Sequence, residues 1–104
     1  MAYKVQMTES ADRDLEEIAK YITVKISNSK SVAELLDEFL EKKKLLEKSP
    51  LMYPLCSYLR LQEEGYHRFV VKNNFIALYL INENNKIVTI MRIFYTKRDY
   101  EKLI

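Results

Sequence analysis

The chain has 104 residues, 48% of them hydrophobic and 31% charged, which predicts one folded domain over residues 1–104 and excludes a disordered protein. Its net charge of +2 is too small to predict nucleic-acid binding by itself, and its single glycine excludes the glycine-rich loops that bind dinucleotides or nucleoside triphosphates. One cysteine and one histidine cannot supply a zinc tetrad or an internal disulfide, so we expect no metal, no cofactor and a reducing, cytoplasmic setting.

The first half of the chain is predicted to form a short strand and two helices. Residues 3–7 alternate apolar and polar side chains, as in a half-buried strand. Thr8 offers a hydroxyl cap to a helix predicted from about Glu9 to Ile26, where apolar residues recur at helical spacing. Ser31, followed three residues later by a glutamate, forms a capping box for a second helix that ends before Pro50. The short connection between the two amphipathic helices predicts an antiparallel hairpin.

The second half of the chain changes to β-branched and aromatic residues that are typical of strands. After a proline-containing loop, four strands are predicted: Tyr58–Gln62, Tyr66–Lys72, Phe75–Ile81 and Ile87–Tyr95. Their three short links favour an antiparallel meander. The sequence therefore predicts an α+β protein of order β-α-α-β-β-β-β, with a helical hairpin packed on a curved, mainly antiparallel sheet.

His67 is the obvious candidate for a proton shuttle, because imidazole titrates near neutrality. Strand alternation places it on the same face as Phe69 and Val71, and a histidine on an apolar face is more often packed and hydrogen-bonded than catalytic. His67 is the only histidine that could serve Cys56 as a base. We therefore expect Cys56 to be a small buried hydrophobic residue and not a nucleophile.

Arg92 interrupts an otherwise apolar strand, so its charge needs a partner or a functional pocket. The structural interpretation is a salt bridge to Asp99 or to a helix carboxylate, and the functional one is an anion site for a phosphate or an acidic partner. On a neighbouring strand, Arg68 and Lys72 share the face opposite to His67. The residues alone leave both interpretations of Arg92 open.

Several motifs follow one another in a fixed order over nearly the whole chain. They are Ala11–Ile18, Glu47–Pro50, Leu59–Arg60, Gly65–Phe69, Ala77–Tyr79 and Met91–Asp99. In this order and spacing they resemble the RelE/ParE superfamily of toxins from type II toxin–antitoxin modules, and the ParE branch looks closer. His67 stands where an arginine is common in that branch, and Tyr95 stands where a histidine is common.

The resemblance implies a growth-inhibiting cytoplasmic toxin that forms a hetero-oligomer with a cognate antitoxin. ParE-like members poison DNA gyrase, whereas RelE-like members enter the ribosome and cut mRNA. In RelE-like members a basic loop precedes the middle strands, but here that stretch is Gln62–Gly65 with two glutamates, which favours gyrase as the target. A third hypothesis is an inactivated module that binds only its antitoxin.

The resemblance also implies two sets of site residues. If the chain is a ribonuclease, the candidate catalytic residues are Arg68, Arg92, Tyr95 and Arg98. The candidate target-binding residues are His67, Lys72, Lys97, Asp99 and Tyr100.

We expect the antitoxin to bury an amphipathic helix or strand in a groove between the sheet and the helices. This expectation rests on aromatic residues that tend to exposure, among them Tyr53, Tyr58 and Phe75. The chain lacks both a membrane-length apolar run and a basic N-terminal segment followed by an apolar stretch, which predicts a protein that is neither exported nor membrane-embedded.

Overall fold

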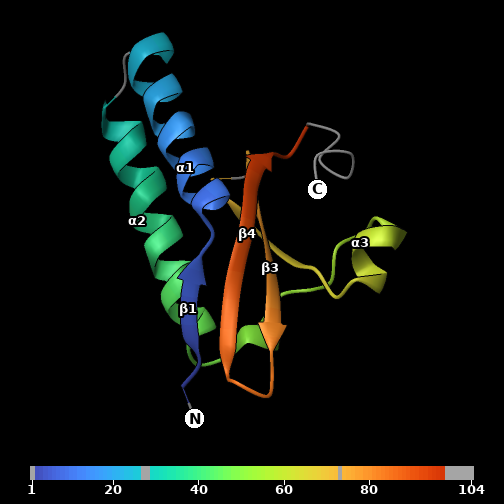
Figure 1. Ribbon diagram of the computed structural model, residues 1–104. Coiled ribbons are helices and arrows are strands. Elements are labelled where there is room, and N and C mark those ends of the chain that lie inside the picture. The colour runs from blue at the N-terminus through green and yellow to red at the C-terminus, as the bar shows by residue number, and fades with distance from the viewer. Residues whose placement is uncertain (1, 27–28, 73, 98–104) are drawn as a thin grey trace.

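A four-stranded sheet with helices on both faces forms the computed structural model, which describes residues 2–26, 29–72 and 74–97 (Figure 1). In chain order its elements are β1 (Lys4–Met7), α1 (Glu9–Tyr21), the π-helical turn η1 (Ile22–Ile26), α2 (Ser29–Leu46), the 3₁₀ turn η2 (Pro50–Met52), α3 (Leu59–Glu63), β2 (His67–Val71), β3 (Phe75–Asn82) and β4 (Ile87–Tyr95). Within the described ranges, no helix combines the length and the apolar character needed to cross a membrane.

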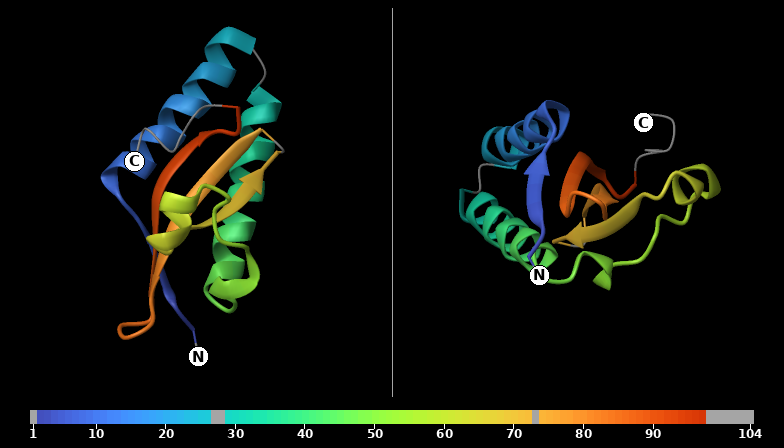
Figure 2. Two further views of the ribbon diagram at one scale, coloured as in Figure 1. Left: turned by 90° about the vertical axis from the view of Figure 1, so that its right-hand side faces the viewer. Right: turned by 60° about the horizontal axis from the view of Figure 1, so that its bottom comes forward.

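The strands lie in the order β1-β4-β3-β2. Strand β1 runs parallel to β4, and the other two pairings are antiparallel. The strands twist so that the sheet is curved (Figure 2). The predicted α+β architecture, with a helical hairpin on a curved and mainly antiparallel sheet, is confirmed.

Each face of the sheet has its own hydrophobic core. Helices α1 and α2 cover one face, here called the helix face, where Phe39, Phe69 and Tyr79 are almost fully buried (Figure 1). The segment that contains α3 covers the opposite face, here called the α3 face, where Cys56 and Leu78 are fully buried. A side chain on β2, β3 or β4 therefore belongs to one of two environments that the sheet separates.

Helix α1 begins as predicted but ends in an irregular turn. Thr8 is its N-cap, and the Thr8 hydroxyl accepts a hydrogen bond of 3.0 Å from the Ala11 N–H. After Tyr21 the helix widens to π-helical geometry, where the Thr23 hydroxyl donates to the Ala19 carbonyl. Helix α2 begins at Ser29, so the cap predicted at Ser31 is wrong. The two residues before Ser31 are a serine and a lysine, neither of which prevents the helix from beginning earlier.

The predicted strand Tyr58–Gln62 is wrong, because this segment forms helix α3. Arg60 and Glu64 pair at 2.8 Å across one helical turn, an arrangement that supports a helix and not a strand. Gly65, with φ of +89°, follows the helix and allows the Tyr66 N–H to donate back to the Leu61 carbonyl. The sheet consequently has three strands after the helical hairpin, where four were predicted.

Tyr79 links the middle of the sheet to the turn after α2. Its hydroxyl donates a buried hydrogen bond of 2.6 Å to the Pro50 carbonyl. Burial raises the pKa of the Tyr79 phenol well above its ordinary value, so the side chain stays a neutral donor.

The variant Tyr79→Phe should lower the free energy of unfolding by about 1–2 kcal/mol, because it leaves the buried Pro50 carbonyl without its donor. Urea unfolding followed by circular dichroism measures this change. Tyr3→Phe is the matched control, since the Tyr3 hydroxyl bonds Glu83 in an exposed position and its loss should cost less than about 0.5 kcal/mol. Equal losses in the two variants would contradict the role given to Tyr79.

Candidate functional site

The most highly connected charged group in the described structure is the Asp14 carboxylate on α1. It accepts hydrogen bonds from the Arg92 Nε at 2.7 Å, the Arg92 Nη2 at 3.1 Å and the Ile93 backbone N–H at 2.9 Å. Its side chain is only 13% exposed. Because β1 pairs with β4 only as far as Ile90, this carboxylate continues the protection of the β4 edge where the partner strand has ended.

Arg92 is held on two sides. Its guanidinium pairs with Asp14 and lies over the Phe94 ring, 4.6 Å from the ring centroid. The hydrogen bond to Asp14 raises the pKa of Arg92, so its charge is permanent. Of the two salt bridges predicted for Arg92, the one to a helix carboxylate is confirmed. Asp99, the other predicted partner, lies outside the described residues.

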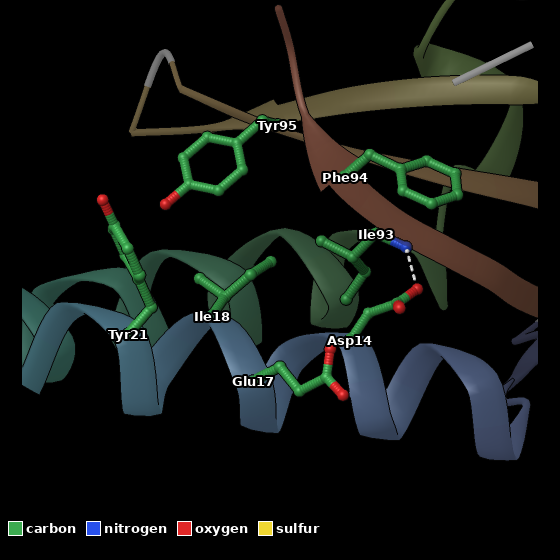
Figure 3. Close-up of a pocket in the computed structure, with 7 residues that line it drawn as sticks. All are labelled: Asp14, Glu17, Ile18, Tyr21, Ile93, Phe94 and Tyr95. Carbon is green, nitrogen blue, oxygen red and sulfur yellow. Dashed lines mark hydrogen bonds between the residues drawn. The ribbon is translucent and has the colours of Figure 1, made fainter. Parts of the chain in front are cut away.

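A hollow of about 270 Å³ opens beside this ion pair, between α1 and β4 (Figure 3). Tyr21 and Tyr95 flank one end of it, with their rings edge-to-face at 6.2 Å, and Asp14 and Phe94 lie at the other end. We call it the α1–β4 pocket; its lining residues are Asp14, Glu17, Ile18, Tyr21, Ile93, Phe94 and Tyr95.

Arg68 lies on the α3 face of β2, opposite Leu78, which in turn lies opposite Arg92. Two strand spacings therefore separate the two arginines, which is about 10 Å. The Arg68 Nε is buried and has no hydrogen-bond partner within the described part of the chain. Burial raises the pKa of the neighbouring Cys56 thiol to about 11, against the opposing effect of the Arg68 charge, so Cys56 is a buried thiol and not a nucleophile.

His67 lies on the helix face, as strand alternation predicts. Its Nδ1 is 2.9 Å from the Tyr53 carbonyl oxygen, and its ring stacks on Tyr79 at 5.3 Å between centroids. The interpretation of His67 as a packed, hydrogen-bonded residue is confirmed. Its imidazole is separated from Arg68 by the sheet itself.

Tyr95 also lies on the helix face, where its ring packs against Phe75 at 4.7 Å and against Tyr21. The structure thus brings Arg68 and Arg92 to one face of the sheet and places Tyr95 on the other. Arg98, the fourth candidate catalytic residue, lies outside the described residues.

Lys72 and Lys97 lie at the same end of the sheet, since Phe75 and Tyr95 are paired in register there. The Lys72 ammonium is 2.9 Å from a carboxylate oxygen of Glu34, and its backbone N–H donates to Glu38 at 2.8 Å. Lys97 is exposed. The other two candidate target-binding residues at this end, Asp99 and Tyr100, lie outside the described residues.

The α3 face carries a hollow of about 600 Å³ between α3 and the turn that joins β3 to β4. Glu64 and Glu83 lie on its rim, and Leu80 and Met91 supply its apolar part. Among the described residues, the hollow included, no three histidine, cysteine, aspartate or glutamate side chains are close enough together to hold a metal ion.

The residues Glu17 and Tyr21 of the α1–β4 pocket were not predicted as site residues. Their spacing of four places them on one helix face, next to the apolar stripe, and Tyr21 remains 48% exposed. An aromatic residue outside the apolar stripe of the helix, Tyr21, was the feature of the sequence that could have indicated this pocket. By contrast Phe75, which was predicted to be exposed, is buried, because the end of the helical hairpin covers it.

Comparisons with known proteins place the chain in a well-defined group. Residues 5–100 match the family model described as the ParE toxin of the type II toxin–antitoxin system parDE. No curated protein sequence matches the chain.

Solved structures share the fold at low sequence identity. The chromosomal ParDE system from P. aeruginosa aligns with a TM-score of 0.71 and 17% identity over 92% of this chain and 98% of that one. The RelBE2 toxin–antitoxin complex from Mycobacterium tuberculosis gives 0.60 and 19% over 91% and 99%. The archaeal RelE–RelB complex from Pyrococcus horikoshii OT3 gives 0.59 and 14% over 94% and 99%.

The contacts of Lys72, the residue after β2, with two glutamates of α2 predict a pH dependence. The hydrogen bond from the Lys72 backbone N–H holds the pKa of Glu38 below its ordinary value, and the Lys72 ammonium does the same for Glu34. A carboxyl whose pKa is lowered by folding stabilises the protein above its unfolded pKa, and this contribution is lost as the pH falls through the folded value. Glu38→Gln should therefore reduce stability at neutral pH and leave it close to wild type at about pH 3.

Thermal unfolding between about pH 7 and pH 3 measures this difference. Glu63→Gln is the matched control, since Glu63 is exposed on α3 and forms no ion pair with a described residue. A constant difference between Glu38→Gln and wild type over the whole range would show that the lost stability is not carried by the ionised carboxylate.

Proposed function

The chain belongs to the ParE toxin family of type II toxin–antitoxin systems, and from this membership we propose that it inhibits growth by binding DNA gyrase in the cytoplasm. A cognate antitoxin neutralises it by forming a hetero-oligomer. Support for the partner comes from the RelBE2 and RelE–RelB structures, which are complexes of toxin and antitoxin. The choice of gyrase rests on the chemistry of the candidate site.

The observation that carries this choice is the division of the candidate catalytic residues between the two faces of the sheet. Cleavage of RNA through its own 2′-hydroxyl needs a base, an acid and a cation within reach of one phosphate. Arg68 and Arg92 lie on the α3 face, while Tyr95 and His67 lie on the helix face. This separation of the two arginines from Tyr95 and His67 favours a binding toxin over a ribonuclease.

The contacts that already hold the Arg92 guanidinium support the same conclusion. Its Nε and Nη2 both donate to Asp14, and its guanidinium face covers Phe94. A phosphate that recruited this arginine would have to displace a carboxylate that is 13% exposed.

The electrostatics of the α3 face also favour a protein target. Glu64 and Glu83 line the hollow there and pair with Arg60 and Lys86, so these groups supply no excess positive charge to attract the phosphates of an RNA strand. Carboxylates at a protein interface can instead pair with lysine or arginine side chains of the partner.

A ribosome-dependent ribonuclease is the second candidate. Arg68 and Arg92 lie on one face at a separation of about 10 Å, which would suit two contacts to an RNA backbone. Harmless expression would instead favour an inactivated module that binds only its antitoxin.

The test combines induced expression in a bacterial host, read out by growth and by primer extension on a reporter mRNA, with a gyrase supercoiling assay on the purified protein. We expect growth arrest, inhibition of gyrase supercoiling by the purified protein, and intact reporter mRNA in primer extension. Tyr95→Phe, which keeps the packed ring and removes the hydroxyl, should leave growth arrest unchanged. Codon-phased mRNA cuts with normal supercoiling, or loss of arrest in Tyr95→Phe, would overturn the gyrase proposal in favour of a ribonuclease.

A further inference from the structure

The α1–β4 pocket is negatively charged although an arginine lies beside it. Glu17 and Asp14 both line it, and the only cation in contact, Arg92 among the described residues, is bonded to Asp14. Arg92 also interacts electrostatically with Glu17, but one guanidinium balances only one of the two carboxylates, so the three groups together keep a net negative charge. A cationic group fits this balance better than an anionic or neutral one.

The walls of the pocket define the shape of that cation. Ile18 and Ile93 form an apolar floor, and the rings of Tyr21 and Tyr95 stand at one end (Figure 3). Such a site suits a long aliphatic stem with a charge at its tip. A planar guanidinium can donate two hydrogen bonds side-on to a carboxylate and stack against a phenol ring, which an ammonium cannot do equally well.

A second hollow of about 270 Å³ adjoins the pocket on the outer side of α1 and shares Glu17 and Tyr21 with it. Its remaining lining residues are Lys20 and Val24, and Val24 is 63% exposed. Lys20 repels a second cation, so this hollow suits an apolar side chain. The two hollows together therefore suit a partner segment that carries one basic and one apolar side chain.

We propose that the α1–β4 pocket binds an arginine side chain of the antitoxin, with an adjacent apolar side chain over Tyr21 and Val24. The identity of the partner rests on the proposed function. The guanidinium pairs with Glu17, and its stem lies on Ile18 and Ile93.

The first experiment titrates blocked arginine, Nα-acetyl-arginine amide, into isotope-labelled protein and follows backbone amide shifts. We expect shifts that centre on Glu17, Tyr21 and residues 93–95. Nα-acetyl-citrulline amide, which has nearly the same shape without the charge, should bind at least about fivefold more weakly. Equal binding of the two compounds, or shifts that centre elsewhere, would overturn the proposal.

Two variants test the role of the carboxylate. Glu17→Gln should weaken arginine binding about fivefold, which is the loss expected for one exposed charge-assisted contact. Glu16→Gln removes the same charge from an exposed neighbouring position on α1 that does not line the pocket, and should bind like wild type. Equal weakening in both variants would mean that only the general charge of α1 attracts the ligand.

The last experiment examines the partner itself, with the antitoxin encoded beside this chain. Glu17→Arg should speed dissociation of the purified complex at least tenfold more than Glu16→Arg, because a like charge then faces the bound arginine. Equal rates would show that the arginine is not the antitoxin's. Blocked arginine binds, or fails to bind, whether or not expression arrests growth, so this proposal and the proposed function can fail separately.

Discussion

One carboxylate closes the gap that the short first strand leaves in the sheet. Asp14 accepts three hydrogen bonds, two from Arg92 and one from the Ile93 N–H, at the point where β1 has ended. The opposite edge is closed in the same way by α2, since Glu38 accepts from the Lys72 N–H and Lys42 donates to the Val70 carbonyl. Both helices thus satisfy backbone groups that an open sheet would expose, which fixes how they lie on it.

The position of α1 determines what the site can do. Because Asp14 holds α1 against β4, a pocket that Glu17 also lines remains between them, and Arg92 forms a structural pair with Asp14. The sheet separates Tyr95 and His67 from Arg68, so these three side chains do not share one face. Recognition of protein partners is the chemistry that this arrangement supports best.

The sequence predicts the architecture well because strand alternation and helical periodicity are local properties. It places His67 correctly with Phe69 on the helix face, and Thr8 correctly as a cap. It fails at α3, where Leu59 and Leu61 imitate strand alternation but a pair one helical turn apart, Arg60 and Glu64, supports a helix. A helix carboxylate was one of the two predicted partners of Arg92, but Asp14 itself could not be singled out, since it lies 78 residues away and its position depends on where β1 ends.

The most direct test of this account is a double-mutant cycle on Asp14 and Arg92, using Asp14→Asn, Arg92→Gln and the double variant. Urea unfolding of the four proteins gives the coupling free energy between the two side chains. If the pair holds α1 against β4, the coupling should be at least about 2 kcal/mol. Additive losses, with a coupling below about 0.5 kcal/mol, would contradict the account and leave Arg92 available for another role.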